Sequence, residues 1–146
     1  MALRRMDNVE IIVDDLEGMI AFLEELGMEL EGKALLEEAW AARVVGFEEQ
    51  SIDVAMMRTP DGHGRIELAK YNRPAAISGV PEDAPANTLG LRRIMFAVDD
   101  LDDTVTRLRT HGAELVGEVA QVGDNYRLCY LRGPEGVVIA LAEELA

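Results

Sequence analysis

Few residues of this chain combine the type and the spacing that chemistry requires. His63 and His111 are its two histidines, and no metal-ligand spacing surrounds either of them. Cys129 is the single cysteine and lies in the apolar stretch LCYL, which predicts a buried small side chain rather than a nucleophile. Glu10 lies in the middle of the run VEIIV, where a carboxylate is costly to bury unless water or a ligand solvates it. Exposure to solvent and a ligand cavity both remain open for Glu10.

The composition bounds the class of protein. With 146 residues, of which 49% are apolar, the chain can bury the core of one compact domain. Its 28 acidic and 14 basic residues give a net charge of −14, which disfavours binding to nucleic acid and to anionic membranes. The sequence shows no secretory leader and no apolar run of about 18 residues, so we expect a cytoplasmic protein.

The elements that must position any site come from an internal repeat. The segment VDDL occurs at residues 13–16 and again at 98–101, each time after a β-rich run. The turns at 60–62 and 134–136 read Pro-Asp-Gly and Pro-Glu-Gly, and each precedes a segment of the form I-x-L. Two copies of one supersecondary unit explain these matches better than chance does.

Each copy predicts the order β-α-β-β-β. The first strands span residues 6–13 and 92–98. Helices begin at the double aspartates, with Asp14 and Glu17 as a capping box, and they end at glycines. The remaining predicted strands are 28–32, 52–58 and 65–69 in the first copy, and 114–120, 126–132 and 137–142 in the second.

The repeat sets the predicted domain boundaries. The first unit spans residues 1–70 and the second 91–146, with a proline-containing linker at 71–90, and together they form one domain. Residues 34–46 do not fit the repeat and predict an inserted short helix or lid. Trp40 of this insertion would close over an apolar ligand, or it would make an ordinary core or dimer contact.

The duplicated unit, with its VDDL helix starts, P-D/E-G turns and I-x-L strands, resembles the vicinal oxygen chelate (VOC) superfamily. This superfamily includes glyoxalases, extradiol dioxygenases, methylmalonyl-CoA epimerases, fosfomycin-modifying enzymes and bleomycin-binding resistance proteins. The resemblance covers residues 6–145. It implies an α+β fold in which two tandem βαβββ units form a cupped mixed sheet of about eight strands, with helices outside and a ligand cavity inside.

The resemblance also implies four positions for a divalent metal. In the family's metal enzymes a His on the first strand and a Glu on the last strand of each unit bind the ion. The matching residues here are Asn8, Glu67, Arg93 and Ala140. Asn8 is a weak ligand, Arg93 would repel a metal, and Ala140 has no donor atom. We therefore expect no family-type metal and no other cofactor, and a degenerate metal site.

Glu67 and Arg93 are the catalytic candidates that the resemblance implies. If the sheet closes as in the family, they would face each other and form an ion pair in place of the metal. Glu67 would then act as a general base, although a nearby arginine lowers the pKa of a carboxylate and weakens it as a base. Two alternatives stay open: a purely structural ion pair, and an Arg93 that holds a carboxylate or phosphate of the substrate.

Further residues are predicted to line the cup and bind the substrate. The two-residue period of a strand puts Glu10 on the same face as Asn8, and Met95 on the same face as Arg93. Tyr130 belongs to an aromatic strand face that would form either a cavity wall or ordinary packing. The predicted substrate-binding residues are Asn8, Glu10, Trp40, Met95 and Tyr130.

Three functions are compatible with the sequence. The first is a small-molecule-binding protein of the glyoxalase and bleomycin-resistance type, acting as a lyase or isomerase in which Glu67 moves a proton next to a carbonyl. The second is a non-catalytic binder that sequesters a small molecule or cationic antibiotic, which the acidic composition would suit. The third is a metal-dependent glyoxalase or dioxygenase with a rearranged site using Asn8, Glu10 and Glu67. For each we expect a homodimer.

Overall fold

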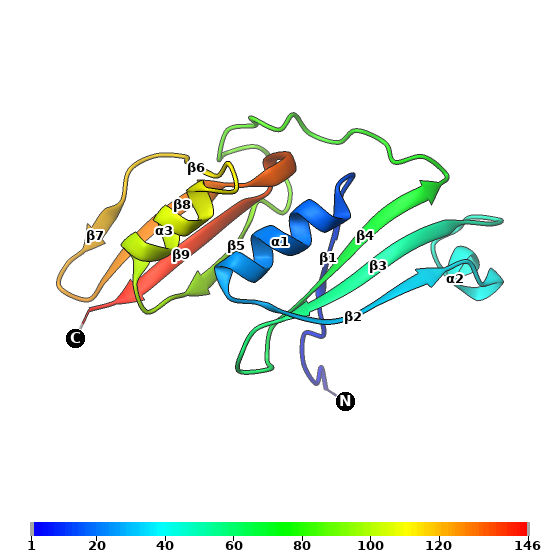
Figure 1. Cartoon of the computed structure of the whole chain (residues 1–146), viewed down its shortest axis with the longest axis horizontal. Coiled ribbons are helices and arrows are strands. Elements are labelled where there is room, and N and C mark those ends of the chain that lie inside the picture. Colours follow the sequence, from blue (N-terminus) through cyan, green and yellow to red (C-terminus); the bar gives the residue numbers. More distant parts are fainter. Residues whose placement is uncertain (1, 146) are drawn as a thin grey trace. The chain divides into compact units, whose positions relative to one another are not determined.

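The computed structural model describes residues 2–145 of the chain, which divides after Ile77 into two compact units. Each unit has its own β-sheet and its own helix of more than two turns (Figure 1). The two sheets have four and five strands, and both mix parallel with antiparallel pairs. The predicted α+β class with two βαβββ units is confirmed.

The first unit contains a four-stranded sheet with the strand order β1-β4-β3-β2. Strand β1 is parallel to β4, and the other neighbours are antiparallel. Its elements are β1 (Val9–Ile12), α1 (Leu16–Leu26), β2 (Glu29–Leu36), α2 (Ala39–Val44), β3 (Ser51–Arg58) and β4 (Arg65–Arg73).

The second unit repeats this plan with the path β5-β9-β8-β6, and a further strand, β7, pairs with β8. Here β5 is parallel to β9 and the other pairs are antiparallel. Its elements are β5 (Arg93–Ala97), α3 (Leu101–Arg109), β6 (Glu114–Leu115), β7 (Ala120–Val122), β8 (Tyr126–Arg132), a 3-10 turn (Pro134–Gly136) and β9 (Val138–Glu144).

The repeated aspartates cap the two long helices in the same way. The backbone N–H of Gly18 donates to Asp15 Oδ1 at 2.9 Å, and that of Asp103 donates to Asp100 Oδ1 at 3.0 Å. The predicted capping box of Asp14 and Glu17 is wrong, because the cap lies one residue later and Glu17 forms an ion pair with Lys33 of β2.

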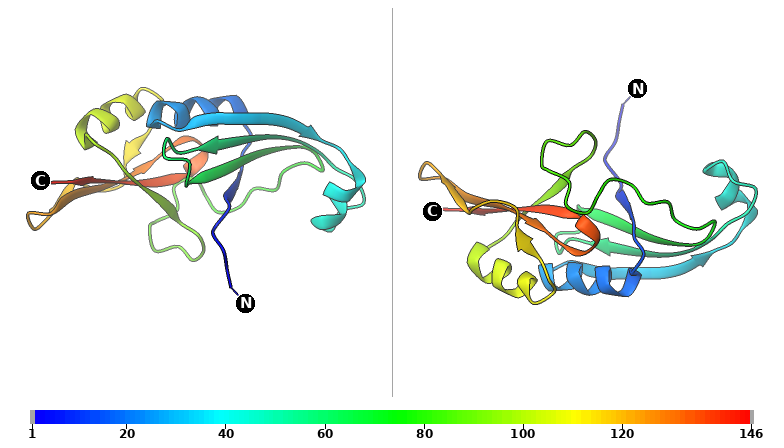
Figure 2. Two further views of the ribbon diagram at one scale, coloured as in Figure 1. Left: turned by 90° about the horizontal axis from the view of Figure 1, so that it is seen from below. Right: turned by 90° about the horizontal axis from the view of Figure 1, so that it is seen from above.

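The long helices cover one face of each sheet, α1 over β3 and β4, and α3 over β8 and β9 (Figure 2). The large residues beneath and on the helices are fully buried; they include Phe22, Leu23, Met57 and Leu68 in the first unit and Leu101, Leu108, Leu131 and Leu141 in the second. Burying each such side chain contributes about 1.5–3 kcal/mol to stability. We call the opposite face of each sheet, turned away from α1 or α3, its front face.

Several predicted boundaries differ from the structure. Strand β2 continues beyond Gly32 to Leu36 through a β-bulge, so the predicted insertion begins inside a strand. Strand β4 continues to Arg73, inside the predicted linker, because its pairing with β3 runs on as far as Ser51. The predicted strand 114–120 is two short strands, β6 and β7, separated by a turn.

Two expectations from composition can be compared directly with the structure. Cys129 is buried, as predicted. Within residues 2–145, none of the helices has the length and apolar character needed to cross a membrane.

Candidate functional site

Two carboxylates lie side by side on the front face of the first sheet. Glu10 of β1 and Glu67 of β4 are partners in the parallel register of these strands. The neighbours of Glu67 in β4, Ile66 and Leu68, point to the helix face and are buried. Because side chains alternate along a strand, Glu67 points to the opposite, front face. The pair therefore follows from strand register rather than from a sequence motif.

The Glu67 carboxyl group raises the pKa of Glu10. The pKa of Glu10 is raised to about 7, first by the hydrogen bond between its side chain and Glu67, then by partial burial and by the negative charge of Glu67. A hydrogen bond between two carboxyl groups requires one of them to be protonated. The pair as a unit can therefore donate or accept a proton around pH 7.

Aromatic side chains extend this face of the first unit. Tyr71 follows Glu67 and Ala69 in the alternation of β4, and its pKa is raised by burial and then by the negative charges of Glu10 and Glu67. Phe47, from the segment after α2, meets Tyr71 edge to face, with ring centroids 6.4 Å apart. Tyr71 was missed because it lay in the predicted linker, although its spacing from Glu67 by four residues continues the strand period.

The front face of the second sheet carries a different group of residues. The guanidinium carbon of Arg93 lies 4.6 Å from the centre of the Tyr130 ring. Met95, Ala140 and Tyr130 form one row across β5, β9 and β8. Met95 is 55% exposed, whereas Ala140 beneath these side chains is completely buried.

The structure thus brings together some of the predicted site residues and not others. Glu10 is paired with Glu67, and Arg93 with Tyr130. Asn8 is exposed just before β1, and Trp40 lies in α2 with 58% of its surface exposed. The ion pair predicted between Glu67 and Arg93 would join residues of different units and stays a prediction.

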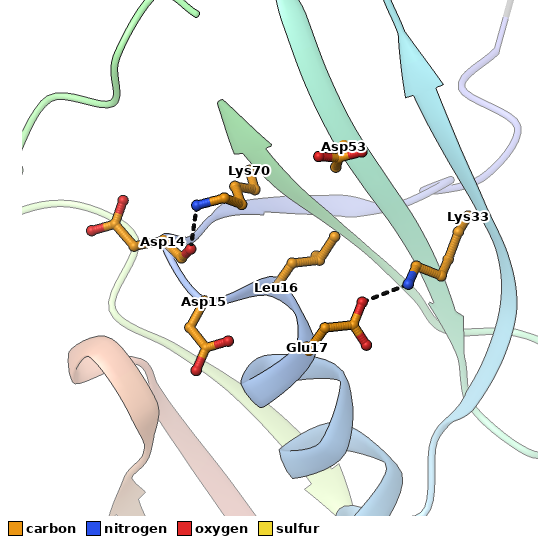
Figure 3. Close-up of a pocket in the computed structure, with 7 residues that line it drawn as sticks. All are labelled: Asp14, Asp15, Leu16, Glu17, Lys33, Asp53 and Lys70. Atoms are coloured by element: carbon orange, nitrogen blue, oxygen red, sulfur yellow. Dashed lines mark hydrogen bonds and ion pairs between the residues drawn. The ribbon is translucent and has the colours of Figure 1, made fainter. Parts of the chain in front are cut away.

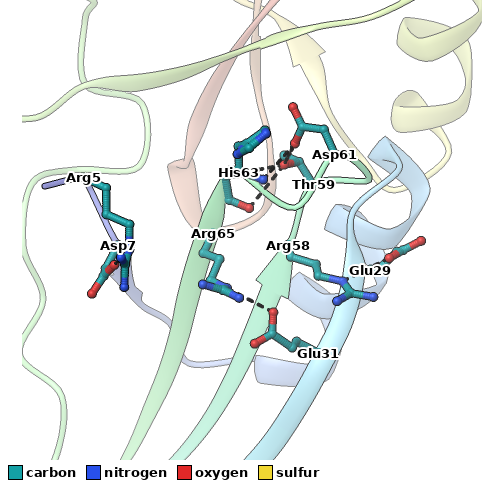
Figure 4. Close-up of polar contacts among 10 residues, drawn as sticks. Arg5, Asp7, Glu29, Glu31, Arg58, Thr59, Asp61, His63 and Arg65 are labelled. Carbon is teal, nitrogen blue, oxygen red and sulfur yellow. Dashed lines mark hydrogen bonds and ion pairs between the residues drawn. The ribbon is translucent and has the colours of Figure 1, made fainter.

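His63 lies in the hairpin turn between β3 and β4. The Thr59 hydroxyl and the backbone N–H of His63 donate to Asp61 at 2.6 and 3.0 Å, and these bonds lower the pKa of Asp61 (Figure 4). His63 is exposed, and His111 lies in the turn after α3. Both histidines therefore lie in turns, and the backbone N–H of each donates a hydrogen bond within its turn.

A pocket of about 440 Å³ lies at the start of α1, on the helix side of the first sheet (Figure 3). Its cations are already engaged: Lys70 donates to the Asp14 carbonyl at 2.8 Å, and Lys33 pairs with Glu17. Its lining residues are Asp14, Asp15, Leu16, Glu17, Lys33, Asp53 and Lys70. The sheet separates this pocket from the Glu10 and Glu67 carboxyl groups.

Comparison with known proteins identifies the family. Residues 5–141 match the model of the Glyoxalase/Bleomycin resistance protein/Dioxygenase superfamily. The chain belongs to this superfamily. The predicted resemblance is therefore confirmed at the level of the superfamily.

Solved structures of glyoxalase-type proteins share this architecture. A glyoxalase family protein from Bacillus cereus is 53% identical, with a TM-score of 0.96, and the match covers 100% of this chain and 97% of that one. The fosfomycin resistance protein FosX of Listeria monocytogenes has the same fold, with 15% identity, a TM-score of 0.63, and coverage of 97% and 92%.

Curated relatives match over a shorter length. Proteins of Mycobacterium bovis and Mycobacterium tuberculosis that bear the name "Putative glyoxylase CFP32" are 29% identical over 84 residues, which is 56% of this chain. The match covers 32% of each of those proteins, so the chain spans about a third of the length of the curated relatives it matches.

The superfamily's metal positions do not offer a four-ligand set in this chain. Ala140 has no donor atom, and the cationic Arg93 lies against Tyr130. Glu67 is hydrogen-bonded to Glu10, a residue outside the family's ligand positions. Residues 2–145 contain no cluster of three or more His, Cys, Asp or Glu side chains arranged to hold a metal. Of the four residues matched above to the family's ligand positions, Glu67 alone carries a carboxylate or imidazole group.

Proposed function

We propose that this superfamily member binds a small molecule and moves a proton next to a carbonyl group, as a lyase or isomerase, using the Glu10 and Glu67 carboxyl pair. The observation that carries the proposal is the pairing itself: two carboxyl groups in register on adjacent strands, joined by a hydrogen bond. With the proton on Glu10, the carboxylate of Glu67 is the acceptor for a substrate proton.

The raised pKa of Glu10 supports a role for the pair in proton transfer. Near neutral pH a carboxyl group with its ordinary pKa is almost fully ionised, and it is then a poor source of protons. A pKa of about 7 at Glu10 lets the pair exist with one proton near neutral pH. The proposed reaction takes no step through a metal, which agrees with the poor donor set at the family's positions.

Exchange of substrate protons with solvent deuterium tests the proposal. The protein is incubated in D₂O with a panel of 2-oxo acids and glutathione adducts, and loss of the proton next to the carbonyl is followed by NMR. Glu67→Gln should slow exchange by about 100-fold or more while leaving the melting temperature nearly unchanged. Glu29→Gln is the matched control, because Glu29 lies on the same sheet in an exposed ion pair with Arg58. Equal exchange by the wild type and Glu67→Gln would contradict the proposal.

Metal analysis gives a separate check of the metal-free reaction. Protein purified without added metal should contain well below one equivalent of divalent ion, and chelation should leave deuterium exchange unchanged. One full equivalent that resists chelation would contradict the degenerate-site part of the proposal.

A second candidate function is a non-catalytic binder of a cationic small molecule. The net charge of −14 favours it, because an acidic protein attracts cations at long range. A binder would show a higher melting temperature with cationic antibiotics and no deuterium exchange with any carbonyl compound, because ligands that bind the native state stabilise it.

A further inference from the structure

Arg93 contacts an aromatic ring and has no acidic partner within its own unit. Its guanidinium carbon lies 4.6 Å from the centre of the Tyr130 ring, and among the described residues of the second unit it forms no ion pair with a carboxylate. The face of an aromatic ring attracts the positive charge but leaves the in-plane N–H donors of a guanidinium free. The ring therefore holds the arginine in place while its hydrogen-bonding edge stays available.

The surroundings of Arg93 on the front face of the second sheet are apolar. Its partner in the register with β9 is Val138, and the next row consists of Met95, Ala140 and Tyr130. The nearest cation across the same sheet is Arg132, which donates to the carbonyls of Glu82 and Ala84 at 2.8 Å each. These two hydrogen bonds occupy the guanidinium of Arg132.

Several other strand arginines of this acidic chain have carboxylate partners. Arg58 pairs with Glu29 at 3.1 Å and Arg65 pairs with Glu31 at 3.0 Å (Figure 4). In the second unit Arg127 makes two hydrogen bonds to Asp102, at 2.9 and 3.0 Å. Acidic residues outnumber basic ones by 28 to 14, yet on this face neither Arg93 nor Arg132 has a carboxylate partner within the second unit.

We propose that Arg93, held against Tyr130, is an oxyanion-binding site of the second unit, which takes the carboxylate or phosphate group of a small molecule. A guanidinium presents two parallel N–H donors that match the oxygens of either group. The apolar neighbours Val138 and Met95 leave the arginine as the polar anchor of this part of the sheet. Occupancy of this site does not depend on proton transfer by Glu67.

An NMR titration tests this site without knowledge of the natural ligand. The Nε–H signal of Arg93 is followed while pyruvate, inorganic phosphate or the neutral analogue pyruvamide is added to the full-length protein at constant ionic strength. Pyruvate or phosphate should shift the signal saturably below about 50 mM, and pyruvamide should not. Saturation by pyruvate alone assigns a carboxylate site, and saturation by phosphate alone assigns a phosphate site.

Variants check that the shift comes from binding at Arg93. Arg93→Met should weaken binding, measured on the backbone amide signals of β5 and β8, by about tenfold or more. Arg109→Met is the control for net charge, because Arg109 lies in the last turn of α3, and it should bind like the wild type. The proposal is overturned if neither anion saturates the wild type, or if Arg93→Met binds as tightly as Arg109→Met. Failure of deuterium exchange with intact anion binding would instead count against the proposed proton transfer.

Discussion

The two units have the same arrangement of strands and helix but carry different side chains at equivalent positions on the front faces of their sheets. In the first sheet the row across β1, β4 and β3 consists of Glu10, Glu67 and Met56. In the second sheet the equivalent row across β5, β9 and β8 consists of Met95, Ala140 and Tyr130. The helix faces, by contrast, are alike in both units, with aspartate-capped helices over buried aliphatic side chains.

This difference shows which of these side chains the fold does not require. The second unit builds the same sheet with Met95 and Ala140 where the first has two acids, so the architecture does not require carboxylates there. Two acids in register repel each other unless they share a proton, and they add no apolar contact. Glu10 and Glu67 are therefore best explained by chemistry, which is the basis of the proposed function.

The largest expected effect comes from making the first unit like the second. The double variant Glu10→Met with Glu67→Ala should fold, as judged by circular dichroism and melting temperature, because the second unit already uses this row. It should lose deuterium exchange by at least the roughly 100-fold expected for removal of a general base. An unfolded double variant would show instead that the carboxyl pair has a structural role.

A smaller effect is expected on the pH dependence of stability. The pKa of Glu10 is raised in the folded protein from 4.5 to about 7, so the folded state binds more protons than the unfolded state between these values. Stability should therefore fall as the pH rises from about 5 through about 7. Glu10→Gln, which stays uncharged, should flatten this dependence and be more stable than the wild type at pH 8. Because Glu10 is partly exposed, we expect a gain of about 1 kcal/mol or less.

Thermal unfolding of the wild type and Glu10→Gln at pH 5 and pH 8 measures this effect. Glu29→Gln is again a suitable control, since it removes one charge from the same sheet outside the carboxyl pair. A wild type whose loss of stability between the two pH values matches that of Glu10→Gln would rule out the raised pKa.

The smallest effect concerns the helix face of the second unit. Asp102→Asn removes one of the two oxygens that accept hydrogen bonds from Arg127, and it removes one negative charge from the first turn of α3. Since Asp102 is exposed, its loss should lower the melting temperature by less than the pH-dependent change at Glu10. The hydrogen bonds to Arg127 lower the pKa of Asp102, so this contribution should be lost as the pH falls through the acidic range. A larger drop in melting temperature than at Glu10 would show that this surface pair is unusually strong.

The sequence was sufficient to predict some of the local elements. The spacing of apolar residues and the aspartates placed α1, and β8 was predicted with its observed bounds. The end of β4 was missed because strand length depends on a partner, here the pairing of Arg73 with Ser51, and linker composition does not show this pairing.

The site was predictable in its members but not in its pairing. Alternation placed Glu10, and the family resemblance placed Glu67, on the face where ligands were expected, yet Arg93 was taken as the partner of Glu67. The direct opposition of Glu10 and Glu67 depends on the register of two parallel strands that are far apart in the sequence, and no local pattern fixes that register. The raised pKa of Glu10 depends on the same register, so it could not be predicted from the sequence either.

The shared proton of Glu10 and Glu67 is tested most directly by a carbon-13 NMR titration of the glutamate carboxyl groups. In the wild type one carboxyl group of the pair should titrate near pH 7, and in Glu67→Gln the signal of Glu10 should titrate at lower pH, toward its ordinary value of 4.5. If both carboxyl groups of the wild-type pair titrated at ordinary glutamate values, Glu10 and Glu67 would share no proton at neutral pH, which would contradict the proposed function.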